Sequence, residues 1–175
     1  GMDVNIVDET DEICGLAIQG PTSFSILKTM GLDGIEGRQY LYHDPCHTPM
    51  KTHNPLKVTR ELTGSEVQLS DRCCGESGTL GTSRPDIASQ LRFRKSEELL
   101  TGIRSLTGKE RAEESQTKLL TSCPACQQGL AKYADETGLK TDYIVVEMAS
   151  QLLGDGWQQR FLDRIAQGGI ERVLL

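Results

Sequence analysis

Long hydrophobic runs are absent from this 175-residue sequence, and no apolar stretch reaches the roughly 18 residues that a membrane-spanning helix needs. No secretory signal opens the chain, which favours a reducing, cytoplasmic compartment. Basic stripes are absent as well, and acidic residues outnumber basic ones by 25 to 19, for a net charge of −6. This balance argues against nucleic acid or an anionic membrane surface as a partner.

What remains is a globular composition, with 37% hydrophobic and 25% charged residues. The length suits one domain with a core of its own. The opening Gly1-Met2 resembles a tag remnant before a start methionine, so we expect a piece of a longer protein. A glycine-rich loop near residue 37 suggests that residues 1–37 are a separate N-terminal segment and that residues 38–175 form the main domain.

Predicted strands and helices alternate along the main domain. Apolar and β-branched runs predict four strands, at 39–43, 66–70, 118–122 and 143–148. Capping residues and helical spacing predict helices over 55–64, 83–100, 124–137 and 157–167, with a polar surface loop over 101–117. This alternation indicates an α/β fold with a mainly parallel sheet of about four strands flanked by helices.

The cysteines are the main candidate functional residues of this sequence. The chain has six, namely Cys14, Cys46, Cys73, Cys74, Cys123 and Cys126. All except Cys14, which we interpret as a buried free thiol, follow a predicted strand closely. The carboxyl ends of parallel strands share one edge of a sheet, where such folds place their sites. We therefore expect five thiols from three segments to converge there.

The adjacent pair Cys73-Cys74 favours a metal over a disulfide. Neighbouring Cα atoms lie about 3.8 Å apart, too close for an easy disulfide, but two adjacent thiols can ligate different atoms of one cluster. Cys123 and Cys126 form a CPAC motif at a predicted helix start, which favours the thiolate that binds metal. Thiolates select iron–sulfur clusters, zinc or copper(I). Five thiols favour a cluster over zinc, which needs four ligands.

Two further residue types near these cysteines are candidates. His43, His47 and His53 surround Cys46, and one of them, with His47 the named candidate, could ligate a metal or donate a hydrogen bond to a cluster sulfur. Gly75 follows the pair, either because a side chain would obstruct the cluster or because the backbone needs a positive φ.

The motifs HDPCHTP, DRCCGESG and TSCPAC together resemble the cysteine-rich CCG family. This module occurs in the cysteine-rich subunit of heterodisulfide reductase and in the iron–sulfur subunits of glycolate, lactate and glycerol-3-phosphate oxidation. The resemblance covers roughly residues 38–160. The chain is also similar to the C-terminal CCG segment of bacterial FAD-linked oxidase fusion proteins, whose ending resembles GGIERVLL here.

The resemblance can be carried over residue by residue. Cys46 matches the first motif cysteine, and Cys73 and Cys74 match the adjacent pair. Cys123 and Cys126 match the final CxxC pair. The spacing departs from the family: 26 residues between Cys46 and Cys73 are few, and 48 between Cys74 and Cys123 are many. Family members often carry two such motifs and this chain carries one, so a partner domain or subunit is expected.

The resemblance implies an iron–sulfur redox domain. The five cysteines would hold one [4Fe–4S] cluster, of the noncubane type in heterodisulfide reductase members, for electron transfer or thiol–disulfide chemistry. The partner would be a flavin dehydrogenase domain or subunit that carries FAD and oxidises a small 2-hydroxy acid. A structural zinc domain and a metal-free CPAC dithiol oxidoreductase stay open as alternatives, as does a homo-oligomer.

Overall fold

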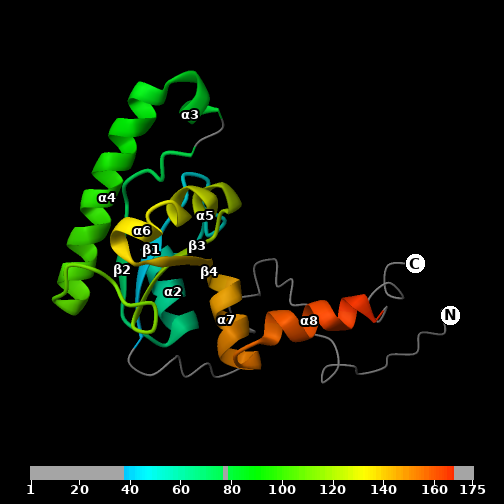
Figure 1. Ribbon diagram of the computed structural model, residues 1–175. Helices are drawn as coiled ribbons and strands as arrows, with labels where there is room; N and C mark the ends of the chain where they lie inside the picture. Colours follow the sequence, from blue (N-terminus) through cyan, green and yellow to red (C-terminus); the bar gives the residue numbers. More distant parts are fainter. Residues whose placement is uncertain (1–37, 77–78, 168–175) are drawn as a thin grey trace.

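The computed structural model describes residues 38–76 and 79–167 (Figure 1). The predicted N-terminal segment 1–37 and Cys14 lie outside these ranges. In chain order the elements are β1 (Gln39–His43), α2 (Pro55–Thr63), β2 (Val67–Leu69), α3 (Leu80–Ser83), α4 (Pro85–Thr107), β3 (Thr117–Thr121), α5 (Pro124–Ala131), α6 (Ala134–Thr137), β4 (Lys140–Tyr143), α7 (Ile144–Leu153) and α8 (Trp157–Ala166).

The four strands form one sheet in the order β2-β1-β3-β4, and every neighbouring pair is parallel. The predicted α/β fold with a parallel sheet is therefore confirmed. The two central strands, β1 and β3, are buried along almost their whole length, as parallel strands covered on both faces must be. Among the described residues, no helix combines the length and the apolarity that crossing a membrane requires.

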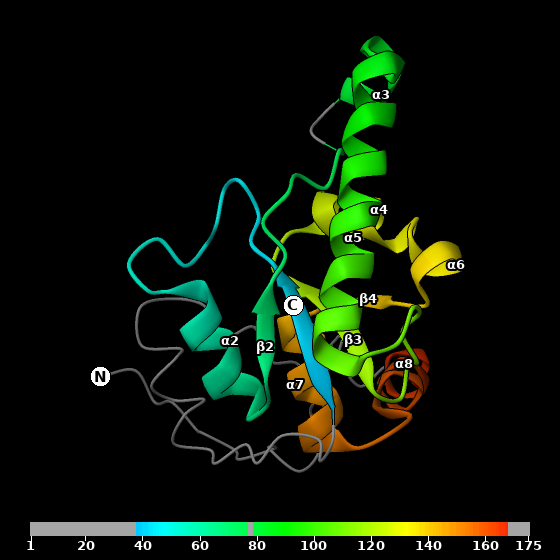
Figure 2. The ribbon, with the colours of Figure 1, turned by 90° about the vertical axis from the view of Figure 1, so that its left-hand side faces the viewer.

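Helices cover both faces of the sheet, so the core has two halves. On one face Leu41 and Leu119 pack with residues of α4 and α5 and with Tyr133 and Leu139, which flank α6. On the other face Tyr40 and Leu120, their chain neighbours, pack with residues of α2 and α7. Figure 2 shows α4 and α7 on opposite sides of the strands, with the N-terminal half of α4 reaching beyond the sheet. Strand alternation thus decides which helix each strand residue contacts.

Two sequence-based assignments are wrong. Residues 143–148 were predicted as a strand because they are apolar and β-branched, but β4 ends at Tyr143 and α7 begins at Ile144. Ile144 and Met148, four residues apart, lie on the buried face of this helix. The stretch 101–117 was predicted as a loop, but α4 continues to Thr107 and ends at Gly108 with a φ of 70°.

The glycine within α4 packs instead of ending the helix. A Cβ atom on Gly102 would lie 2.8 Å from Cδ2 of Leu41, so α4 approaches β1 more closely than any larger residue allows.

Two other helix boundaries also differ from the predictions. The helix expected from Ser83 starts at Pro85, and the one expected over 124–137 is split into α5 and α6.

A buried ionic cluster fastens α7 to the start of the central strands. The Glu147 carboxylate accepts hydrogen bonds from the Tyr40 hydroxyl at 2.8 Å, from Lys118 Nζ at 2.6 Å and from Arg38 at 2.8 Å. Burial alone would raise the pKa of Glu147, but these donors together hold that pKa below its usual range. The charged carboxylate is therefore part of the folded state.

We expect the Glu147→Gln substitution to weaken the fold and to reduce its sensitivity to acid. The folded-state pKa lies below the unfolded one, so this carboxylate stabilises the fold above about pH 4.3 and that contribution is lost as pH falls through the folded-state pKa. Urea unfolding should show a loss of about 3 kcal/mol at pH 7 and a flatter decline below about pH 4.3.

The matched control is Glu114→Gln, which removes an exposed carboxylate 3.0 Å from Lys140. Its effect on the free energy of unfolding should stay below about 1 kcal/mol. If the free energy of unfolding fell as steeply with decreasing pH in Glu147→Gln as in the unchanged protein, the buried carboxylate would not govern acid stability.

Candidate metal centre

The five predicted cysteines lie on turns at the carboxyl edge of the sheet. Cys46 follows β1, and the pair Cys73-Cys74 follows β2. Cys123 follows β3 as the N-cap of α5, and Cys126 lies in the first turn of that helix. The prediction that the cysteines occupy the carboxyl strand ends is therefore confirmed. All five thiols in the described part of the chain are outside any disulfide.

The closest contact joins the second member of the pair to the CPAC motif. The sulfurs of Cys74 and Cys126 lie 3.4 Å apart, and both residues are buried. A hydrogen bond joins the two side chains, and it lowers the pKa of Cys74 while it raises the pKa of Cys126. Two cysteines that are 52 residues apart in sequence thus meet in a buried hydrogen bond.

The other three cysteines lie closer to the surface. Cys73 and Cys123 are half-buried, and Cys46 is exposed. Burial raises the pKa of the Cys73 thiol, and the nearby charges of Cys74 and Cys46 raise it further. Cys123 in turn packs against the apolar cluster that contains Cys74 and Cys126. The centre therefore has a buried side and an open side.

His43 joins the buried side. It is the last residue of β1 and only 1% exposed, and a ring nitrogen lies within 4.8 Å of the sulfurs of Cys74 and Cys126. His47, the named candidate from the sequence, is exposed beside the exposed Cys46. Strand alternation could have favoured His43 over His47 among the three candidate histidines, because His43 follows Leu41 by two residues and Leu41 packs in the same cluster as Cys74 and Cys126.

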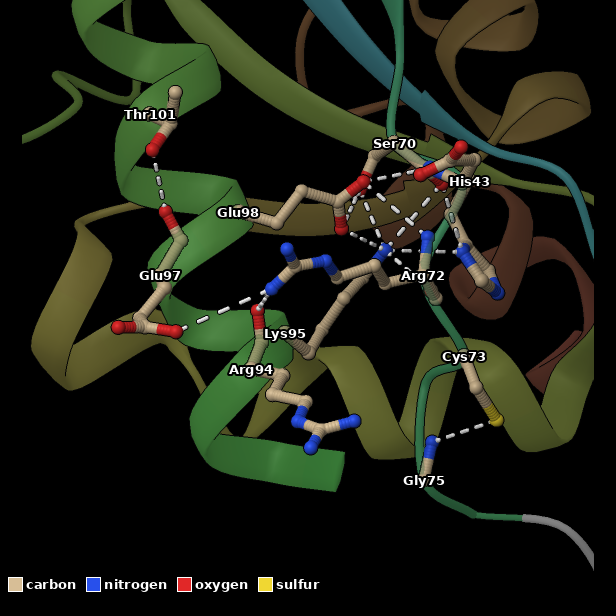
Figure 3. A network of polar contacts seen from close by, with 11 residues as sticks. His43, Ser70, Arg72, Cys73, Gly75, Arg94, Lys95, Glu97, Glu98 and Thr101 are labelled. Carbon is tan, nitrogen blue, oxygen red and sulfur yellow. Dashed lines mark hydrogen bonds and ion pairs between the residues drawn. The ribbon is translucent and has the colours of Figure 1, made fainter. Parts of the chain in front are cut away.

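A buried lysine holds the turn that carries the cysteine pair (Figure 3). Lys95 of α4 is fully buried and donates to the Ser70 hydroxyl at 2.6 Å, the Arg72 carbonyl at 2.7 Å and Glu98 at 2.8 Å. The other Glu98 oxygen accepts from the backbone N–H groups of Asp71 at 2.7 Å and Arg72 at 3.2 Å. The polar groups before Cys73 are thereby fixed to one helix.

Gly75 and Glu76 fix the other end of the turn. Gly75 has a φ of 80°, which supports the prediction that the backbone needs a positive φ at this position. Its N–H donates to the Cys73 sulfur at 3.4 Å. Glu76 accepts from Arg92 of α4 at 2.9 Å and from Lys132 beyond α5. These contacts tie the turn to the helices on either side.

The comparisons with known proteins agree with this arrangement. The sequence model of the family described as Cysteine-rich domain, CCG, matches residues 40–131. The chain belongs to this family. A second match, to a domain of unknown function called DUF3400, covers residues 131–175. The CCG match ends within the helices that follow the last cysteine motif, so it contains all five cysteines.

Two curated proteins that this CCG domain resembles are named as iron–sulfur proteins. An uncharacterized iron–sulfur protein of Methanococcus maripaludis is 28% identical over 121 residues, 63% of this chain and 22% of its own length. A second uncharacterized iron–sulfur protein, from Methanocaldococcus jannaschii, is 28% identical over 124 residues, again 63% of this chain and 22% of its own length.

A third relative carries the name of an enzyme component. This subunit of the CoM/CoB fumarate reductase of Methanothermobacter marburgensis is 29% identical over 104 residues, 56% of this chain and 19% of its own length. The CCG domain thus spans about a fifth of the curated relatives that it matches. No solved structure matches it.

The donor set of this edge suits a thiophilic metal or cluster. Its grouped donors are thiols and one buried imidazole, in place of the carboxylate oxygens that Mg²⁺ or Ca²⁺ prefers. Within the described residues, Nε2 of His43 is buried and without a hydrogen-bond partner. An iron–sulfur cluster and zinc both fit these donors, because both bind thiolate and imidazole.

We expect Lys95→Met to disturb the centre through the turn before Cys73. Methionine keeps most of the side-chain volume but removes the donors to Ser70 and Arg72, so buried oxygens lose their partners. The free energy of unfolding should fall by about 2 kcal/mol, and iron bound after reconstitution should fall with it.

The control is Arg94→Met on the same helix, which truncates an exposed side chain. Iron content and stability should stay near those of the unchanged protein. If Lys95→Met bound iron as fully and as stably as Arg94→Met, the lysine would not hold the site.

Proposed function

We propose that residues 38–175 form an iron–sulfur redox domain in which Cys46, Cys73, Cys74, Cys123 and Cys126 hold one [4Fe–4S]-type cluster. The observation that carries the proposal is the 3.4 Å approach of Cys74 and Cys126, with three further cysteines on adjoining turns of the same sheet edge. The names of the relatives, two of them iron–sulfur proteins, support it.

The adjacent pair has separate roles in this proposal. Cys74 is buried and directed at Cys126, whereas Cys73 is half-buried and its sulfur accepts the Gly75 N–H. The two thiols would therefore ligate opposite sides of one cluster. Such clusters accept and release single electrons, at potentials that depend on hydrogen bonds to sulfur and on solvent exposure. Gly75 supplies one such hydrogen bond.

The open side of the site would face the redox partner. Cys46 is exposed, so the cluster edge that it holds would lie close to the surface and within reach of a docked protein. We propose a flavin dehydrogenase domain or subunit with FAD as that partner, and a small 2-hydroxy acid as its substrate. The match covers only about a fifth of the length of these relatives, one of which is a fumarate reductase subunit. This supports an enzyme built from several domains or subunits.

Zinc is the second candidate occupant. The nitrogen of His43 and the sulfurs of Cys74 and Cys126 lie within 4.8 Å of one another, which is a spacing that one ion can bridge. A fourth thiolate would complete a tetrahedral site. In that case the domain would be a scaffold without electron transfer.

Anaerobic reconstitution with iron and sulfide distinguishes these functions. The unchanged protein should bind about four irons and as much acid-labile sulfide, with visible absorption and an EPR signal after reduction. Cys74→Ser and Cys126→Ser should each lose most of the iron, because they remove the buried ligands. Cys14→Ser, which removes a thiol outside the three motifs, is the control and should bind iron normally.

Other outcomes would replace the proposal. A colourless protein with one tightly bound zinc, lost with unfolding on chelation, would indicate the scaffold. A clean Cys123–Cys126 disulfide without metal uptake would indicate the dithiol oxidoreductase.

A further inference from the structure

We propose that His43 is a ligand of the metal centre through its Nε2 atom, so that the centre has a mixed sulfur and nitrogen donor set. This inference rests on the proposed function and adds to it a nitrogen ligand outside the three cysteine motifs.

His43 has a fixed and buried position beside the two inner cysteines. His43 ends the central strand β1, next to Thr121 of β3 in the sheet register, so rigid elements fix its backbone. Its side chain is 1% exposed, and its ring lies within 4.8 Å of the two sulfurs that are themselves 3.4 Å apart. Cys74 and Cys126 thus lie close to an imidazole that water hardly reaches.

The contacts of Nδ1 indicate where the ring proton of His43 lies. His43 Nδ1 lies 3.1 Å from the carbonyl oxygen of Ser70 and 3.3 Å from Lys95 Nζ. An ammonium has three N–H donors, and shorter contacts of 2.6, 2.7 and 2.8 Å to Ser70, Arg72 and Glu98 use all three. Lys95 therefore has no proton left for Nδ1, and Nδ1–H donates to the Ser70 carbonyl.

The other ring nitrogen, Nε2, is then the atom that can bind a metal. With the proton on Nδ1, Nε2 of the neutral ring carries a lone pair, and Figure 3 shows it on the side of the ring away from Lys95. Within residues 38–76 and 79–167 this buried atom has no hydrogen-bond partner. A buried acceptor without a partner is unfavourable, because it has lost its water and gained nothing in exchange. A thiophilic metal held by Cys74 and Cys126 satisfies the lone pair directly.

The Ser70 carbonyl and Lys95 also complete the support that metal-bound histidines have in proteins. The second ring nitrogen of such a histidine usually donates to a carbonyl or carboxylate, which fixes the tautomer and the ring orientation. Here the turn held by Lys95 supplies that carbonyl. The same contacts that position Cys73 and Cys74 therefore orient His43.

A nitrogen ligand would change the redox behaviour of the centre. Imidazole is neutral where thiolate is anionic, so the centre would carry one negative charge less than a centre held by thiolates alone. Replacement of cysteine by histidine ligands raises the reduction potential of iron–sulfur centres. We accordingly expect His43→Cys to lower the potential of the reconstituted protein.

Pulsed EPR on protein labelled with ¹⁵N-histidine provides the test. The chain has three histidines, so the double substitution His47→Ala/His53→Ala leaves His43 as the sole source of labelled nitrogen. Reconstituted with iron and sulfide and then reduced, this variant should show the strong coupling of a directly bound imidazole. His43→Ala should lose the coupling, while His47→Ala keeps it.

A second measurement covers loading with a different metal. X-ray absorption of the double variant loaded with zinc alone should show a nitrogen shell with the outer scattering of an imidazole. If the double variant binds iron or zinc but shows neither the coupling nor the nitrogen shell, His43 is not a ligand and the cysteine centre stands. If the unchanged protein binds neither metal, the proposed function itself fails and this inference with it.

Discussion

The buried ammonium of Lys95 is the interaction on which the cysteine edge depends. A charge in the interior is tolerated only when each of its hydrogens has an acceptor, and the hydroxyl, carbonyl and carboxylate around it meet that demand. Burial lowers the pKa of Lys95 while Glu98 opposes the shift. Because two of the acceptors belong to the turn before Cys73, the turn adopts the shape that solvates the charge.

The sheet carries a buried ionic cluster at each end, and the two serve different helices. At the amino edge Glu147 fastens α7 to β1 and β3, and at the carboxyl edge Lys95 fastens α4 to the turn after β2. Apolar packing covers the faces between them. This division leaves the carboxyl edge to the turns that carry the thiols.

Local sequence predicted the sheet and the cysteine edge, because strand periodicity and turn residues act over a few neighbours. It could not predict the two partners of Lys95 in the turn before Cys73, which are 23 and 25 residues away, because this lysine lies in a basic stretch that looks like solvated helix surface. It also mistook α7 for a strand, since an apolar run such as that at 143–148 suits a buried strand and a buried helix equally. In the helix, Glu147 reaches Lys118, which is a tertiary contact that the local pattern does not contain.

The exposure of the cysteines falls from Cys46 at the surface to Cys74 and Cys126 inside, and this gradient has a consequence for assembly of the centre. If the proposed centre binds here, an incoming metal or preformed cluster would meet the outer thiols first, and ligation would proceed inward from Cys46. Loss would begin at the same exposed edge, where oxygen and chelators reach the outermost bond while the inner ones are still shielded. Whatever protein docks over Cys46 would therefore act as a lid that slows both exchange and damage.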